Sequence, residues 1–467
     1  MLSRRQVLTN AIATSLASAL LPRWVRATRM LDPAAPDRPY LDAALAAERW
    51  IARSAIREGT GLTWPVDPRK PESVDATLYS GSPGVVLFYL ELHAVTGDAR
   101  FLDLAMAGAD YLIAHMPATS ASLGDEGAGL YTGLAGLVYV LALTAERTRE
   151  RRFASAAARG LSVLDDALTP AGDGAAWNAS NDIIAGTSGI LLTGMWLEQR
   201  PRGGYVYPVR RDTQRRAVRH LIEAGVREHG GTTWSINSQV PRRYPNFSHG
   251  AAGVGYTLAT FAMHDRKSAE APLALGASLS AATYLDTITT RTVSNGRKIF
   301  HSTPGGEQLF YMSWCHGPAG TARFYRQLRA ATGDARWAEY GPQLSQGILD
   351  SGVPETHPDR SGFWNNISQC CGNCGVAEYF AAQHVATGDA SSLAFARRVM
   401  DNVIARGVTD GDAMSWPQAE NRVSPENIVA QTGLMQGAAG VGLALLHLDG
   451  AIARRAPVVV RPDTPRW

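Results

Sequence analysis

Residues 81–97 read Gly-Ser-Pro-Gly-Val-Val-Leu-Phe-Tyr-Leu-Glu-Leu-His-Ala-Val-Thr-Gly. The stretch opens with a G-x-x-G element, continues as an apolar run and ends at another glycine. A helix that is apolar on nearly every side is typical of a buried position. A glycine after the last helical residue commonly takes the left-handed conformation that ends a helix. The pattern therefore predicts a buried helix that begins at the glycine pair.

The same G-x-x-G element occurs seven times along the chain. The copies are Gly81–Gly84, Gly133–Gly136, Gly186–Gly189, Gly250–Gly253, Gly317–Gly320, Gly372–Gly375 and Gly437–Gly440. Regular recurrence of this kind indicates a repeat architecture. Because glycine lacks a Cβ, each pair is expected to allow close approach of neighbouring backbones and a positive φ in the entering loop.

A second recurring signal closes the predicted helices. Thr-Gly-Asp occurs at 96–98, 332–334 and 387–389, with its glycine 13 residues after the second glycine of the preceding pair. The aspartate can cap the N-terminus of a following helix. Each unit is thus expected to contain an inner buried helix, a tight turn and an outer amphipathic helix.

Seven such hairpins, without strand-like alternation between them, predict an all-α fold. We expect an α/α toroid of seven inner and seven outer helices, and an open solenoid is the alternative. The long inserts at 200–245 and 265–312 are expected to decorate the ring and are placed to cover the mouth of its cavity.

Composition and charge exclude several functional classes. The 467 residues are 45% hydrophobic and carry a formal net charge of +3. Four arginines and no acidic residue lie within residues 1–27, so the rest of the chain has a net charge of −1. This balance does not indicate nucleic-acid binding. The chain has no uninterrupted apolar stretch of 18 residues, so no stable membrane span is expected once the N-terminal segment is removed.

The N-terminal segment has the organisation of an export signal. Arg4 and Arg5 precede an apolar run at 11–21, and Val25-Arg26-Ala27 is a small-residue cleavage pattern. The segment resembles a twin-arginine signal. We therefore expect residues 1–27 to be a signal segment, residues 28–467 to form a single helical domain, and the protein to be exported to the periplasm or beyond. The alternative is an attached amphipathic helix on a cytoplasmic protein.

All four cysteines lie near the G-x-x-G elements of the fifth and sixth copies. Cys315 and Cys370 each stand two residues before the first glycine, and Cys371 stands one before it. Equivalent positions in adjacent loops can converge on one ion, and thiolates suit zinc. A disulfide between Cys315 and Cys370 is the alternative. Cys374 lies inside its glycine pair and is expected to be a small packed residue.

Three stretches resemble the lanthionine synthetase C-like family, which includes the lantibiotic cyclases. Residues 314–320, Trp-Cys-His-Gly-Pro-Ala-Gly, resemble the W-C-x-G-x-x-G element of that family. Cys370-Cys371-Gly372 stands where the family usually has Cys-His-Gly. Residues 434–442 resemble its closing repeat, and the likeness spans roughly residues 40–450.

The resemblance implies a zinc ion held by Cys315, Cys370 and Cys371, with a fourth position open to a substrate thiol. It also implies that Asp182 lines the active site and that His249 acts as an acid or base. Tyr311 stands where cyclases of the family often have arginine, and His316 stands where they often have tyrosine.

The implied reaction is zinc-dependent addition of a thiol to dehydroalanine or dehydrobutyrine in a peptide, which forms a lanthionine-type thioether. The expected partner is a peptide or a small thiol. One alternative is a non-catalytic zinc-containing scaffold that binds peptides. Another is a glycosidase on the same toroid, with Asp182 and Glu378 as its candidate acids.

Overall fold

The computed structural model describes residues 37–465, except 126, 200–202, 238 and 356–361. The predicted signal segment, residues 1–27, lies outside the described residues. The chain divides after Pro39 into two compact units. The second unit, Tyr40–Trp467, contains the seven G-x-x-G elements and every candidate site residue.

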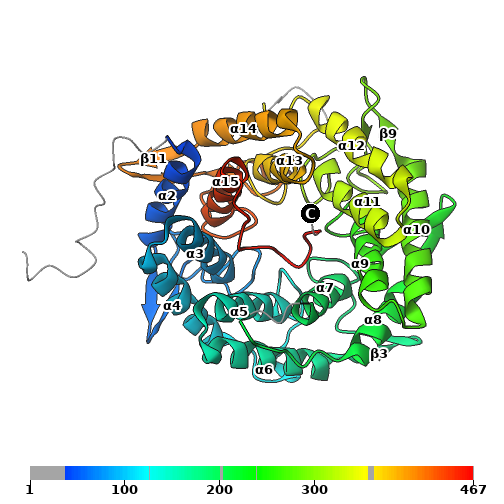
Figure 1. Ribbon diagram of the computed structural model, residues 1–467, viewed down its shortest axis with the longest axis horizontal. Helices are drawn as coiled ribbons and strands as arrows, with labels where there is room; N and C mark the ends of the chain where they lie inside the picture. Colours follow the sequence, from blue (N-terminus) through cyan, green and yellow to red (C-terminus); the bar gives the residue numbers. More distant parts are fainter. Residues whose placement is uncertain (1–36, 126, 200–202, 238, 356–361, 466–467) are drawn as a thin grey trace, which may run out of the picture. The chain divides into compact units, whose positions relative to one another are not determined.

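Seven inner helices begin directly after the first glycine of each G-x-x-G element (Figure 1). Their bounds are α3 (Ser82–Thr96), α5 (Leu134–Thr148), α7 (Thr187–Glu198), α9 (Ala251–His264), α11 (Pro318–Thr332), α13 (Asn373–Thr387) and α15 (Ala438–Ile452). Most of them are apolar nearly all round, as a helix enclosed by neighbours should be, whereas α11 has a polar side with Arg326 and Arg329.

Seven outer helices alternate with the inner ones along the chain. In α4, for example, Phe101, Ala105 and Leu112 face the core while the opposite side meets solvent. The outer helices are α2 (Pro39–Ala52), α4 (Ala99–His115), α6 (Arg151–Ala167), α8 (Arg211–Glu223), α10 (Glu270–Ile288), α12 (Tyr340–Leu349) and α14 (Ala390–Ala405). Two 3-10 turns, η2 (Ser120–Ser122) and η3 (Ala335–Glu339), complete the helical elements that the structure describes.

The ring of inner helices is closed. Each inner helix contacts the next one along the chain, and α15 returns to contact α3. The outer helices join as well, because the Tyr40 hydroxyl of α2 donates a hydrogen bond of 2.9 Å to Asp401 of α14. The predicted toroid is confirmed, and the open solenoid is wrong.

The predicted helix stops are also confirmed. Gly97, Gly333 and Gly388 have φ of 69°, 71° and 74°, which is the left-handed conformation expected after a helix. The following aspartates cap the next helix, as Asp98 shows by accepting a hydrogen bond from the Arg100 backbone N–H.

The glycine pairs are required for space and not for backbone conformation. A Cβ on Gly320 would lie 1.9 Å from the Trp314 carbonyl oxygen, and one on Gly253 would lie 1.9 Å from the Phe247 carbonyl oxygen. The expected close approach is therefore confirmed. The expected positive φ is wrong at the helix entries, because Gly81 and Gly317 have φ of −100° and −125°.

In the part of the chain that the structure describes, seven two-stranded antiparallel hairpins connect the helices, and the sequence pattern did not predict them. Each strand has only two to four residues, which is too short for an alternating pattern of apolar and polar residues to be recognised. The pairs are β1 (Ile56–Glu58) with β2 (Gly61–Thr63), β3 (Thr169–Ala171) with β4 (Gly174–Ala176), β5 (Val226–Glu228) with β6 (Gly231–Thr233), β7 (Ser235–Asn237) with β8 (Val240–Arg243), β9 (Thr290–Arg291) with β10 (Arg297–Lys298), β11 (Val408–Asp410) with β12 (Ala413–Ser415), and β13 (Gln418–Ala419) with β14 (Ile428–Val429).

The two long inserts contribute more than decoration. They contain the outer helices α8 and α10, so they form part of the ring itself. The β7–β8 hairpin of the first insert supports a loop of the ring, because the Asn181 N–H donates to the Ile236 carbonyl at 2.8 Å. Among the described residues, no helix is both long and apolar enough to cross a membrane.

Candidate metal centre

A circle of backbone hydrogen bonds joins the seven loops that lead into the inner helices. Seven N–H···O=C bonds of 2.8–3.1 Å link each loop to the next, at or next to the position two residues before the first glycine. We call this circle the rim belt. Its members in chain order are Tyr79, Tyr131, Ile183-Ile184, Ser248, Cys315, Cys370 and Met435, and Met435 closes the circle by donating to Tyr79.

The rim belt brings two of the predicted metal ligands side by side. The Cys315 N–H donates to the Cys370 carbonyl oxygen at 3.1 Å, so the two residues occupy equivalent positions in adjacent loops. The Cys370 N–H donates the next bond of the rim belt, to the Met435 carbonyl oxygen at 3.0 Å. The expectation drawn from the repeat register is confirmed for this pair, and Cys371 follows directly in the same loop.

The three thiols converge. The sulfur atoms of Cys315, Cys370 and Cys371 all lie within 4.8 Å of one another. Cys371 Sγ is 3.3 Å from Cys315 Sγ and 3.4 Å from Cys370 Sγ. All four cysteines of the chain are free, so the disulfide alternative is not realised. Cys374 is fully buried in α13 and lies outside the cluster.

The cluster fits a zinc ion. Zinc binds thiolate sulfur at about 2.3 Å in a tetrahedral arrangement, which separates neighbouring sulfurs by about 3.8 Å. The observed spacings are close to this value, and a set of three soft donors matches the preference of zinc. Cys315 and Cys370 are buried, and Cys371 is the most exposed residue of the three.

Hydrogen bonds favour negative charge on one of the sulfurs. Bonds from Cys315 and then Cys371 lower the pKa of Cys370, although burial opposes the effect, and the Tyr79 hydroxyl adds a smaller contribution. Gln436 donates to the Tyr79 hydroxyl oxygen at 2.9 Å and lies 3.9 Å from Cys371 Sγ. A buried thiolate supported in this way attracts a cation.

The two predicted catalytic residues form a pair. His249 Nδ1 lies 2.5 Å from Asp182 Oδ2. The other carboxylate oxygen accepts backbone N–H bonds from Ala185 and Gly186, both at 2.9 Å, so the entry to α7 fixes the orientation of the carboxylate. Asp182 is buried, and 27% of the His249 side chain is exposed.

The pair shares one rim with the thiols. His249 and His316 stack with ring centroids 5.5 Å apart and planes 28° apart, and His316 directly follows Cys315. The charge of His249 also contributes to the lowered pKa of Cys370. The structure thus gathers all five predicted site residues at one end of the ring.

The sequence pattern missed His301, which comes from the loop after β10. Its ring lies 4.2 Å from that of His316 and 4.8 Å from that of Tyr311, between centroids. Burial, followed by the charges of Arg422, His249 and Arg242, lowers the pKa of His301 to about 4. No local motif marks this residue, because its position depends on how the second insert folds back over the rim.

The two acids of the glycosidase alternative do not meet. Glu378 pairs inside the ring with Arg461 at 3.1 Å and with His447 at 3.0 Å. Burial raises the pKa of Glu378, but Arg461 and His447 outweigh it and hold the pKa below its ordinary value. Asp182 is instead bound to His249 at the rim. Both carboxylates are therefore engaged by different partners.

A sequence profile of lanthionine synthetase C-like proteins matches residues 72–458. The chain belongs to this family. The match contains all seven glycine pairs and the five rim residues described above. No curated protein sequence matches the chain.

One solved structure supports the fold of this lanthionine synthetase C-like protein. Nisin cyclase superposes with a TM-score of 0.58 at 14% identity, over 88% of this chain and 98% of that chain. An α-1,6-mannanase variant of Salegentibacter sp. HEL1_6, in complex with α-1,6-mannotetrose, reaches a TM-score of 0.45 at 10% identity, over 88% and 99% of the two chains. At this level of identity the likeness to nisin cyclase shows the shared toroid alone.

Proposed function

We propose that this protein catalyses zinc-dependent addition of a thiol to dehydroalanine or dehydrobutyrine in a peptide. The observation that carries the proposal is the placement of three convergent thiols and an Asp182–His249 pair on one rim, in a member of this family. The nisin cyclase likeness favours a peptide substrate, and a small thiol is the natural second substrate.

Cys315, Cys370 and Cys371 are the residues that would hold the metal. When bound, zinc supplies the acidity that keeps a substrate thiol deprotonated near neutral pH, where a free thiol with a pKa of about 8.5 is mostly protonated. The partial exposure of Cys371 leaves an approach for that thiol.

His249 completes the addition. As the thiolate sulfur bonds to the β-carbon of the dehydrated residue, the electrons of the carbon–carbon double bond move onto the α-carbon and its carbonyl. The α-carbon then needs a proton, which His249 donates. Asp182 binds the Nδ1 side of the ring, so Nε2 is the nitrogen that donates the proton to the α-carbon. The proton lost by the substrate thiol returns to solvent.

The proposal extends to the N-terminal segment. Residues 1–27 act as a twin-arginine signal, residues 28–467 are the exported domain, and the metal is acquired before export, while the thiols are still reduced.

The test uses the full chain, a dehydroalanine peptide and a small thiol. Metal content is measured for wild type and Cys315→Ala, and the thioether product is followed by mass spectrometry for wild type and His249→Asn. The proposal requires about one zinc per wild-type chain, its loss in Cys315→Ala, and product formation that depends on His249. Zinc without any product would instead favour the non-catalytic scaffold, and absence of zinc would refute the metal centre.

A further inference from the structure

The C-terminal tail, residues 453–465, runs back through the ring. In Figure 1 it leaves α15 and crosses the middle of the circle of inner helices. α15 begins at the rim, so the tail starts at the opposite end of the ring. The backbone N–H groups of Val458 and Val459 donate to the buried Glu91 carboxylate of α3, at 3.0 and 2.8 Å.

Further along, the tail approaches the rim. The Trp196 indole of α7 donates to the Val460 carbonyl at 3.2 Å. Arg461, which is 4% exposed, pairs with Glu378 of α13 at 3.1 Å. Glu378 lies only six residues after the first glycine of its repeat, near the rim end of α13. The tail thus rises along the axis of the ring toward the metal centre.

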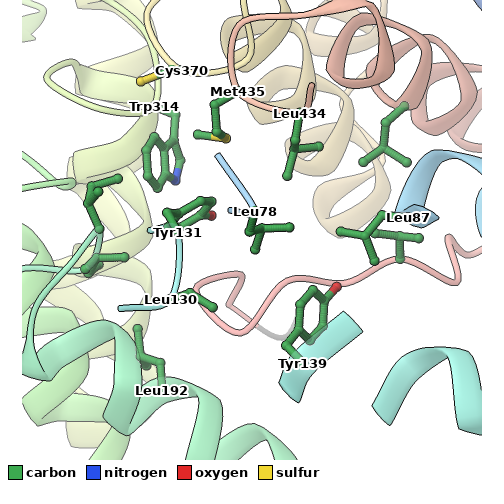
Figure 2. Packing of buried hydrophobic residues seen from close by; sticks show 14 of the residues in the cluster. Leu78, Leu87, Leu130, Tyr131, Tyr139, Leu192, Trp314, Cys370, Leu434 and Met435 are labelled. Atoms are coloured by element: carbon green, nitrogen blue, oxygen red, sulfur yellow. The ribbon is translucent and has the colours of Figure 1, made fainter. Parts of the chain in front are cut away.

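Asp463 ends this path directly beneath the rim belt. Its carboxylate is fully buried and accepts hydrogen bonds from the Tyr131 hydroxyl at 3.0 Å and the Trp314 indole N–H at 2.9 Å. Arg323 of α11 lies 3.1 Å from the same carboxylate. Tyr131 is a member of the rim belt, and Trp314 immediately precedes Cys315. Figure 2 shows Trp314 and Tyr131 packed together below Cys370.

A buried carboxylate with these partners is well suited to fix them. Removing it would leave the Trp314 indole N–H without an acceptor and Arg323 without its ion-pair partner, both in a dry environment where unmet polar groups are costly. The Trp314 carbonyl oxygen also packs closely against Gly320, where a Cβ would come within 1.9 Å of it. Trp314 is therefore held from both its side chain and its backbone.

We propose that Asp463 is a positioning residue of the metal centre. By holding the Trp314 side chain and the Tyr131 hydroxyl, it fixes the backbone that presents Cys315 to the other two thiols. The three cysteines then bind zinc tightly only while the C-terminal tail is docked in the ring. This inference rests on the metal-binding part of the proposed function.

The test compares zinc affinity in full-length variants, by competition with a chromophoric chelator. Asp463→Ala removes the carboxylate, and Trp314→Phe removes the indole N–H that binds it, together with part of the buried ring. Glu91→Gln is the matched control, because it removes the charge of another buried carboxylate but keeps an oxygen that can accept the Val458 and Val459 N–H bonds, so the tail stays docked. Thiolate-to-metal charge-transfer absorption of the cobalt(II)-substituted proteins reports the geometry of the site independently of activity.

We expect Asp463→Ala and Trp314→Phe each to weaken zinc binding by about tenfold or more, as loss of a supporting hydrogen bond around a metal typically does. The double variant should bind no more weakly than Asp463→Ala, and Glu91→Gln should keep wild-type affinity and the wild-type cobalt spectrum. Wild-type affinity in a folded Asp463→Ala protein would overturn the inference. If that variant fails to fold, wild-type affinity in Trp314→Phe would overturn it instead. A wild-type protein that binds no zinc would refute the proposed function and this inference together.

Discussion

His249 and Asp182 come from loops of neighbouring repeats and meet at 2.5 Å across 67 residues of sequence. The carboxylate is held by two backbone N–H groups of its own loop and is shielded from solvent, while the imidazole is partly exposed. Asp182 is thus fixed, which suits a residue that orients the imidazole. His249 faces outward, which suits a proton donor.

This pair gives the first prediction. His249→Asn should lower kcat/KM for thiol addition by at least about 100-fold, which is the usual contribution of a general acid. Zinc content should stay at the wild-type level, because His249 is not among the proposed ligands. His115→Asn, the same change on the outer helix α4, is the control and should have normal activity. Full activity in His249→Asn would assign the proton to another group.

The second prediction concerns the ligand set. Cys371→His restores the histidine that the family usually has at this position. We expect the variant to retain zinc and to add thiols several-fold more slowly, because three thiolates place more negative charge around a bound sulfur than two thiolates and a neutral imidazole. Equal rates for the two proteins would contradict this explanation. Cys374→Ala, at the buried cysteine outside the cluster, should leave zinc stoichiometry unchanged.

The third prediction tests the glycine pairs. Gly320→Ala should lower the free energy of unfolding by about 1–3 kcal/mol, because the new Cβ would overlap the Trp314 carbonyl oxygen. Gly276→Ala, within α10, meets no atom within 4 Å and should raise stability by up to about 1 kcal/mol. Urea unfolding measures both. Equal effects at the two positions would mean that close approach is not what the repeat glycine provides.

The fourth prediction concerns pH. The pKa of His301 is about 4 in the folded protein and about 6.5 in an unfolded chain. Between these values only the unfolded chain binds the proton, so the contribution of His301 to stability is complete above pH 6.5 and is lost as the pH falls toward 4. The loss should reach at most about 1.4 kcal/mol per pH unit.

The measurement is urea unfolding between pH 4 and 7 in a Cys315→Ala background, in which metal release does not contribute. Replacing His301 by Gln should make the fall in stability over this interval shallower than in the parent. Identical slopes would show that His301 is protonated as readily in the folded protein as in the unfolded chain.

The fifth prediction concerns export. Changing both Arg4 and Arg5 to lysine should keep the protein in the cytoplasm of a host that has the twin-arginine pathway, since that pathway reads the arginine pair. Cell fractionation and immunoblotting measure the distribution. A lysine pair at Arg242 and Arg243, far from the N-terminus, is the control. Unchanged export of the first variant would remove the twin-arginine interpretation.

The register of the glycine repeat was sufficient to predict most of the rim. It predicted that Cys315 and Cys370 would be neighbours because every G-x-x-G copy enters its helix in the same way, and a local pattern repeated at equivalent positions carries three-dimensional information. The Thr-Gly-Asp stops followed from helix-capping chemistry alone.

What the sequence did not reveal depends on contacts between segments far apart in the chain. Asp463 lies in a short stretch rich in proline and charge, which gives no sign of burial, yet its partners Tyr131 and Trp314 are 332 and 149 residues away in the sequence. His301 belongs to an insert that does not repeat elsewhere. Neither residue stands in a periodic pattern, so only the folded chain brings them to the site.

The closing bond of the rim belt, from Met435 to Tyr79, joins the last repeat to the first. A ribosome releases these loops in order, so the first one must wait for nearly the whole chain before its final partner exists. A nascent toroid is therefore an open arc with two unsatisfied edges, and Asp463 emerges later still. The ring can therefore close only after the seventh repeat has left the ribosome.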